Sequence, residues 1–186
     1  MKSISEFCKE NGISIVQIKE LCGRNGIDIG DIVVFDIFDF TNDIYDRKGI
    51  DDLNRYIRSN QNIYLPKYIL LFHSTGFNLK SIIEEEGLLP TSKNRRRSYQ
   101  STNGFVYLSP NRSISEMFGS LGNGSKIVTF LVLLRTVDLS IDMDQLKNKK
   151  IANPNILIKQ TLADSIVYGG SLRYKGRIEP YKFISL

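Results

Sequence analysis

Apolar side chains recur every three or four positions at the start of the chain, over residues 4–11 and again over residues 15–25. This spacing places them on one face of a helix, so it predicts two short helices. A serine stands before each helix, Ser3 or Ser14, where its side chain can cap the first turn, and a glycine follows each. We expect the two helices to form a hairpin whose apolar faces pack on the rest of the chain.

Apolar and acidic residues then alternate along residues 28–46, as residues 32–40 show. This alternation indicates a half-buried strand, with a bent apolar helix as the alternative. These carboxylates have no histidine nearby and no EF-hand spacing, so we expect no metal site. A further helix is predicted over residues 51–59. Asp51 and Asp52 would stand at its N-terminus, where the helix dipole favours negative charge.

A domain boundary is predicted at residues 60–66, where asparagine, glutamine and proline interrupt the periodic pattern. A chain of 186 residues can hold one core, or one core with a small appended unit. We therefore divide it into a helical N-terminal module, residues 1–62, and a main domain, residues 63–186.

The stretch from residue 68 to residue 119 alternates strand-like and helix-like patterns. Its predicted elements are, in order, a strand over residues 68–72 that ends at His73, a helix over 79–86 that stops at Gly87, a strand over 104–109 that carries Tyr107, and an amphipathic segment from Ser113. His73 is the only histidine of the protein. The two strands are expected to bring it near Tyr107.

Residues 126–134 form the strongest strand pattern, nearly all apolar, and are expected to lie in the centre of a sheet, buried on both faces. A short helix is predicted over residues 156–162. Two more strands follow, over residues 165–168 and 172–175, joined by a pair of glycines. Helices inserted among these strands predict an α+β fold with a small split sheet.

Composition describes an ordinary globular protein, with 41% hydrophobic and 24% charged residues. No run approaches the roughly 18 apolar residues that a membrane span requires, and no secretory signal is evident, so we expect a cytoplasmic protein with reduced cysteines. Four cations crowd residues 93–97. They indicate a loop that contacts phosphates, or simply a solvated one.

The pattern of residues 3–27 is similar to a small helix-turn-helix or to the N-terminal module of bacterial translation initiation factor two. A helix-turn-helix would place Gln17, Lys19 and Arg24 against nucleic acid. The second helix carries few cations and an acidic stretch follows it, which favours the packing hairpin instead.

The central stretch resembles an ADP-ribosyltransferase domain of the histidine–tyrosine–glutamate type, as in diphtheria toxin and the poly(ADP-ribose) polymerases. The matching pieces are His73-Ser74-Thr75 for the first motif, the helix that ends at Gly87-Leu88, Gly104 to Leu108 for the tyrosine strand, and Ser113 to Phe118 for the helix after it. The resemblance covers roughly the last two thirds of the chain and extends weakly to its end. It implies NAD as co-substrate.

The resemblance also implies a role for each matching residue. His73 would bind the adenine-side ribose, the Ser74 backbone the carboxamide, and Thr75 a ribose hydroxyl. Tyr107 would stack on the nicotinamide ring. Ser115 and Phe118, eight and eleven residues after Tyr107, would supply a hydrogen bond to the carboxamide and a second stacking ring.

The glutamate of the third motif is missing, because Ser171 stands at its position. Glu179, eight residues later, is our first choice for the missing carboxylate, and Asp164 is a further candidate. We therefore take His73, Tyr107 and Glu179 as the catalytic residues.

The resulting expectation is an NAD-dependent ADP-ribosyltransferase, a glycosyltransferase that modifies a protein or a nucleic acid, as a bacterial or phage toxin or effector would. Arg95, Arg96 and Arg97 would bind the acceptor, and residues 73–88 also resemble the DNA-modifying toxin branch of the family. Two alternatives stay open. One is an RNA 2′-phosphotransferase with Arg173 or Arg177 among its cations, and the other is a non-catalytic module that binds NAD or ADP-ribose.

Overall fold

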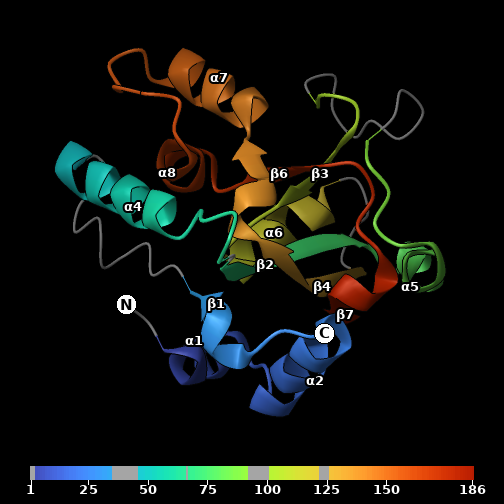
Figure 1. The fold of residues 1–186 in the computed structure, drawn as a ribbon. Helices are drawn as coiled ribbons and strands as arrows, with labels where there is room; N and C mark the ends of the chain where they lie inside the picture. The colour runs from blue at the N-terminus through green and yellow to red at the C-terminus, as the bar shows by residue number, and fades with distance from the viewer. Residues whose placement is uncertain (1–2, 35–45, 66, 92–100, 122–125) are drawn as a thin grey trace.

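The protein has an α+β fold in a computed structural model that describes residues 3–34, 46–65, 67–91, 101–121 and 126–186. Its strands form two small sheets with helices around them (Figure 1). The predicted fold class is therefore confirmed. None of the helices in the described part of the chain is long and apolar enough to cross a membrane.

The larger sheet has the strand order β1-β2-β4-β7. Its strands are β1 (Ile32–Val33), β2 (Tyr68–Gly76), β4 (Ile127–Arg135) and β7 (Phe183–Ser185). β1 runs parallel to β2, whereas β2 and β4 pair in antiparallel register over nine residues. β4 lies between β2 and β7 and is buried along nearly its whole length, so the prediction of a central strand is confirmed.

The smaller sheet has the order β3-β6-β5, with β3 (Phe105–Leu108), β6 (Leu172–Lys175) and β5 (Leu139–Ile141). It meets the larger sheet at one point, where Phe72 and Ser109 exchange two backbone hydrogen bonds of 2.7 and 2.9 Å. Past this bridge the chain leaves the strand direction and starts a helix at Arg112. The two sheets therefore separate just beyond Phe72.

The N-terminal helices are α1 (Ile4–Asn11) and α2 (Ile15–Asn25), with the bounds that the sequence predicts. Ser3 and Ser14 cap them, each in a reciprocal capping box that satisfies otherwise unpaired backbone N–H groups. The glycine after each helix has a φ near +63°, a left-handed conformation that glycine adopts without strain.

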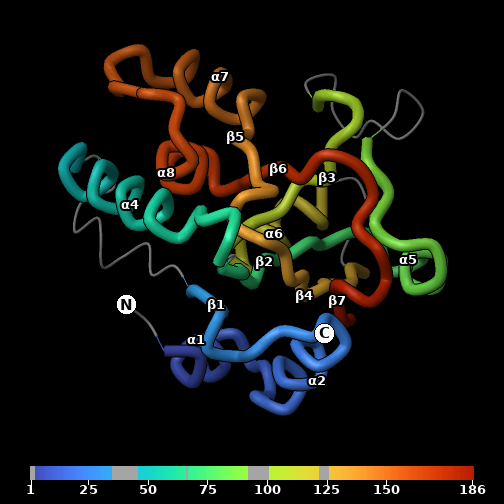
Figure 2. Tube along the Cα trace, in the orientation of Figure 1, coloured from blue at the N-terminus to red at the C-terminus, as the bar shows by residue number. Residues whose placement is uncertain are grey.

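The helical hairpin packs on the larger sheet, as predicted. Phe7, Ile18 and Leu21 share one apolar cluster with Phe72 of β2 and Leu131 of β4. Figures 1 and 2 show the two helices together at one end of the molecule, with α7 and α8 at the opposite end. The boundary near residue 62 stays a prediction, but the hairpin and the sheet bury a common core.

The second cluster of apolar side chains lies between the two sheets, α4 and α8. The remaining helices of the described chain complete the fold. They are α4 (Arg47–Ser59), α5 (Lys80–Glu86), α6 (Arg112–Ser120), α7 (Met143–Ala152) and α8 (Leu162–Asp164), which continues into a π-helical turn η5 (Ser165–Gly169). Short 3-10 turns are η1 (Ile29–Asp31), η2 (Phe77–Leu79), η4 (Thr136–Asp138) and η6 (Pro180–Lys182).

Two predicted element boundaries are wrong. His73 lies inside β2 rather than at its end, because pairing with β4 continues to Gly76. α4 begins at Arg47 and not at Asp51, because Asp46 caps it by accepting from two backbone N–H groups. Most of the strand predicted from residue 32 onward falls outside the described residues, and only β1 is seen.

Two predicted elements are absent from the described chain. The helix expected over residues 156–162 is not formed, and α8 starts only at Leu162, where Thr161 and Asp164 make a capping box. The strand expected over residues 165–168 is the helical turn η5 instead. Ser165 fixes that turn, because its hydroxyl donates to the Ser171 carbonyl at 2.6 Å and accepts from the Asp142 N–H at 2.8 Å.

Candidate functional site

His73 and Tyr107 are in direct contact at the point where the sheets separate. The Nδ1 atom of His73 lies 2.9 Å from the backbone oxygen of Tyr107, on the neighbouring strand β3. Because a carbonyl oxygen can only accept, Nδ1 carries a proton, and in the neutral form of the ring Nε2 is the acceptor nitrogen. This contact orients the imidazole ring.

Ser74 and Ser115, which the resemblance assigns to the same carboxamide, also lie close together. The Oγ of Ser74 lies 2.9 Å from the Oγ of Ser115 on α6 and 2.9 Å from the Oγ1 of Thr129 on β4. Both serines are buried. This contact joins residues that are 41 positions apart in the sequence.

Gly119 allows α6 to approach β2 this closely. A Cβ atom at Gly119 would lie 2.6 Å from the Cβ of Ser74 and 2.7 Å from its carbonyl carbon, closer than real Cβ contacts occur. A side chain here would push α6 away from the strand and separate Ser115 from Ser74. Phe118 is half-buried on the same helix, one turn after Ser115.

The backbone N–H and C=O groups of Ser74 point to the side of β2 away from β4. In an antiparallel ladder, successive residues direct their N–H and C=O groups to opposite edges of the strand. Phe72 directs both groups to Ser109, away from β4, so Ser74 directs its own groups to the same edge. On that edge α6 lies close by, with Gly119 against the Ser74 carbonyl group.

The hydroxyl of Tyr107 is held by two partners outside its own strand. It donates to Oδ2 of Asp144 on α7 at 2.5 Å and accepts from the N–H of Thr102 at 2.7 Å. Burial, together with the hydrogen bond to the Asp144 carboxylate, raises the pKa of Tyr107 to about 12. The phenol is therefore neutral at any physiological pH.

Arg173 lies directly opposite Tyr107 in the smaller sheet. Its Nη1 is 3.8 Å from Asp144, and its guanidinium lies 4.3 Å from the centre of the Phe105 ring, a cation–π contact. Its Nε atom is buried without a hydrogen-bond partner in the described part of the chain. Tyr107, Thr102, Asp144 and Arg173 thus form one polar cluster, which we call the Tyr107 cluster.

The carboxylates considered for the third motif lie in different surroundings. Glu179 is 42% exposed and pairs with Arg177 at 3.0 Å, at the start of η6. Asp164 is fully buried, where it caps α8 and pairs with Arg47 of α4. Neither is bonded to a residue of the Tyr107 cluster among the described contacts.

Ser171 itself donates to Oδ2 of Asp142 at 2.5 Å. Asp142 is fully buried and caps α7 by accepting from the N–H groups of Asp144 and Gln145. Burial raises its pKa, even though the hydrogen bond from Ser171 opposes the shift. A carboxylate therefore does stand beside Ser171, but it is used in the capping of a helix.

The remaining predicted residues are placed as follows. Thr75 is buried on β2, opposite Val128. Arg95, Arg96 and Arg97 lie outside the described residues, so their role in acceptor binding stays a prediction.

The sequence does not reveal Asp144 and Thr102 as residues of the site, because they are polar residues on a helix and in a loop with no motif spacing to Tyr107. Across the described ranges no group of acidic, histidine and cysteine side chains could hold a metal ion.

Cys8 and Cys22 are both buried unpaired thiols in the N-terminal hairpin. Burial raises the pKa of each thiol, which keeps it protonated and unreactive. This agrees with a structural rather than a chemical role.

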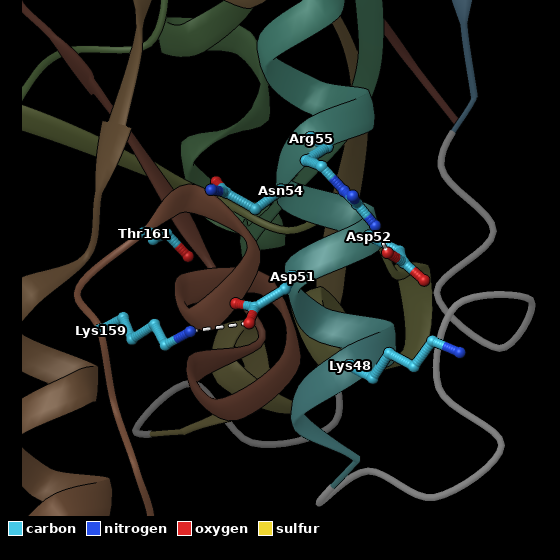
Figure 3. Close-up of a pocket in the computed structure, with 7 residues that line it drawn as sticks. All are labelled: Lys48, Asp51, Asp52, Asn54, Arg55, Lys159 and Thr161. Carbon is cyan, nitrogen blue, oxygen red and sulfur yellow. Dashed lines mark hydrogen bonds and ion pairs between the residues drawn. The ribbon is translucent and has the colours of Figure 1, made fainter.

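An open groove lies elsewhere, along α4. It encloses about 650 Å³ and is lined by Lys48, Asp51, Asp52, Asn54, Arg55, Lys159 and Thr161. Figure 3 shows Lys159 reaching from one wall to Asp51 on the other, a 2.7 Å ion pair. Arg55 pairs with Asp52 on α4 itself. This groove is shallow and its charges are largely matched, so we base no site on it.

The chain matches no model of a known protein family, and comparison with curated proteins gives no match either.

Proposed function

We propose that the protein is an NAD-consuming ADP-ribosyltransferase whose site lies where the two sheets separate, between β2, β3 and α6. The acceptor class that we propose is a macromolecule, either a protein or a nucleic acid. In this reaction the bond between nicotinamide and ribose breaks, and its electron pair leaves with nicotinamide. The lone pair of the acceptor forms the new bond to ribose, and the acceptor's proton passes to water.

The observation that carries the proposal is the contact between Ser74 and Ser115. The resemblance assigns the Ser74 backbone and the Ser115 side chain, 41 positions apart, to the same carboxamide, and their hydroxyls lie 2.9 Å apart. His73 and Tyr107 show the same agreement, in contact across 34 positions. Two independent pairs of this kind support the alignment of the motifs with the strands.

The residues of the site suit an NAD nicotinamide. The N–H and C=O groups of Ser74 point to the side of β2 away from β4, and such a pair would match the two polar atoms of a carboxamide. The ring of Tyr107 is half-buried, and an aromatic face stabilises a flat cationic ring. His73 would bind a ribose hydroxyl through Nε2, since Nδ1 is engaged by a carbonyl oxygen.

The proposal is tested with NAD and the wild-type chain. We expect NAD to bind in isothermal titration calorimetry, and nicotinamide to be released when the protein is incubated with NAD labelled in its ADP-ribose part. Label should pass to an added protein mixture or to added DNA or RNA.

Tyr107→Ala should lower NAD affinity by about 1–3 kcal/mol, because it removes the stacking face. Tyr181→Ala is the matched control, because Tyr181 is half exposed at 51% and lies on η6. An equal NAD affinity in folded Tyr107→Ala protein would contradict the site. Tight binding by the wild type without any release of nicotinamide would favour the non-catalytic binding module.

A further inference from the structure

We infer that Asp144, on α7, supplies the negative charge for this reaction and acts as a positioning residue through its hydrogen bond to Tyr107. The inference rests on the proposed function and replaces Glu179 and Asp164 in the carboxylate role. It assigns a catalytic contribution to a helix that carries none of the motif residues.

Asp144 is placed for this role by four hydrogen bonds. Its Oδ2 accepts from the Tyr107 hydroxyl at 2.5 Å and from the Thr102 N–H at 2.9 Å. Both of its oxygens are within 2.9 Å of the Thr102 hydroxyl. Among the described residues it is the one carboxylate that is bonded to Tyr107, so the structure fixes a negative charge at the far end of the ring.

The surroundings keep this carboxylate ionised. Burial alone would raise the pKa of Asp144, but hydrogen bonds from Tyr107 and Thr102 outweigh it, and the pKa is lowered. The side chain is only 14% exposed, which limits screening by water. Arg173 lies 3.8 Å away and balances part of the charge without a close hydrogen bond.

The other acids are less suitable on physical grounds. Glu179 is 42% exposed, so water and its partner Arg177 screen its charge. Asp164 and Asp142 are fully buried, and both are needed to cap helices, α8 and α7. Asp142 is further disfavoured because burial raises its pKa. A charge that stabilises a developing positive charge must be both ionised and close to the site, and Asp144 meets both conditions.

The test is Asp144→Asn, which keeps the size and an acceptor oxygen but removes the charge. We expect kcat for nicotinamide release from NAD to fall by about 10²-fold, with KM changed by less than about threefold, because the lost charge acts mainly in the transition state. Asp52→Asn is the matched control, because Asp52 is an acid of α4 that lines the groove and pairs with Arg55 rather than with the Tyr107 cluster, and it should leave kcat unchanged.

Tyr107→Phe shows whether Asp144 acts on the reaction through the Tyr107 hydroxyl or only supports the fold. If Asp144 acts through the Tyr107 hydroxyl, the double variant Tyr107→Phe/Asp144→Asn should be no slower than Asp144→Asn alone. Fully multiplicative losses would overturn the inference. So would an unchanged kcat in Asp144→Asn, or a loss of kcat in Glu179→Gln but not in Asp144→Asn.

A folding defect is recognised separately, by circular dichroism and by the unfolding midpoint of each variant. If Asp144→Asn is unfolded, the inference is tested by kcat of the Tyr107→Phe variant. An unchanged kcat in that variant overturns the inference. A wild-type protein that releases no nicotinamide would contradict the proposed function itself. A wild type that is active while the variants are unaffected would contradict only the role of Asp144.

Discussion

Tyr107 is held at both ends before any ligand arrives. Its backbone oxygen accepts from His73, and its hydroxyl is shared between Asp144 and Thr102. A ring fixed in this way loses little conformational entropy when it stacks on a substrate. The same contacts place an imidazole at the backbone end of Tyr107 and a carboxylate at its hydroxyl end.

The phenol of Tyr107 gives a prediction that does not depend on enzymatic activity. Its pKa is raised to about 12 by burial and by Asp144, so its hydroxyl should stay protonated while exposed tyrosines titrate near pH 10. We expect its ¹³Cζ resonance, assigned with Tyr107→Phe, to be constant up to pH 11. In Asp144→Asn the pKa should move down toward 10, because the neutral amide no longer disfavours a phenolate.

The sign of the linked stability effect follows from the same shift. Below pH 10, Tyr107 is protonated in the folded and unfolded states and its contacts contribute in full. Between about pH 10 and 12 the unfolded chain releases the proton first, so stability falls as pH rises through this window. A Tyr107 resonance that titrates together with the exposed tyrosines would contradict the Asp144 contact.

At the scale of the elements, the site depends on how closely α6 packs on β2. Gly119 lies against the backbone of Ser74, and Ser115 lies one turn earlier on the same helix face. Thr129 and Glu116 extend the network with a 3.3 Å hydrogen bond, and Arg112 pairs with Glu116 at 2.7 Å. The helix is thus attached to both β2 and β4 by polar contacts.

Gly119→Ala should destabilise the protein by about 1–3 kcal/mol, because the added methyl group meets the Ser74 backbone, which cannot move aside as a flexible side chain would. Gly23→Ala is the matched control. Gly23 is an exposed glycine inside α2 with nothing within 4 Å of an added Cβ, so the change should stabilise by about 0.5–1 kcal/mol. Urea unfolding measures both, and equal effects would contradict the close packing of α6.

Local signals in the sequence predict some elements well and fail at others for physical reasons. Ser3 and Ser14 lie at real helix starts, because a capping box is made entirely by neighbouring residues. Residues 165–168 contain isoleucine, valine and tyrosine and therefore appear strand-like. They are helical because the Ser165 hydroxyl bonds to Asp142 and Ser171, and no pattern within the segment reveals that.

The candidate site also contains residues that the sequence reveals and one that only the structure reveals. His73, Ser74, Tyr107 and Ser115 can be selected from the sequence, because each belongs to a motif on a strand or helix with fixed spacing. Asp144 cannot, because its nearness to Tyr107 depends on how α7 packs beside the smaller sheet, 37 residues further along the chain. Long-range contacts between elements without a shared motif are visible only in the structure.

For the whole molecule, the main consequence is that the N-terminal hairpin is part of the core. Ile18 and Leu21 are fully buried in the cluster that also contains Phe72 of β2, the residue directly before His73. Arg112 of α6 also donates to the backbone oxygen of Asn11 at the end of α1, at 2.5 Å. The hairpin therefore supports the same strand and helix that carry the site.

Leu21→Ala should lower the free energy of unfolding of the whole chain by about 2–5 kcal/mol, because it removes a buried side chain and leaves a cavity against the sheet. Val16→Ala in the same helix is the control, since Val16 is 57% exposed and should change stability by less than about 0.5 kcal/mol. Chemical unfolding followed by circular dichroism and by tyrosine fluorescence should give one common transition. A separate early transition for Leu21→Ala would show that the hairpin unfolds alone.

The position of β7 has a consequence for synthesis on the ribosome. β7 pairs with β4, and Ile184 and Leu186 pack against the same apolar cluster as the first two helices; Figure 1 shows α2 beside the C-terminus. At ordinary translation rates the roughly 160 residues between α2 and β7 emerge over about 10–30 seconds. Throughout that interval α1 and α2 lack part of their apolar partner surface, so we expect the nascent chain to need protection from aggregation until residues 183–186 have emerged.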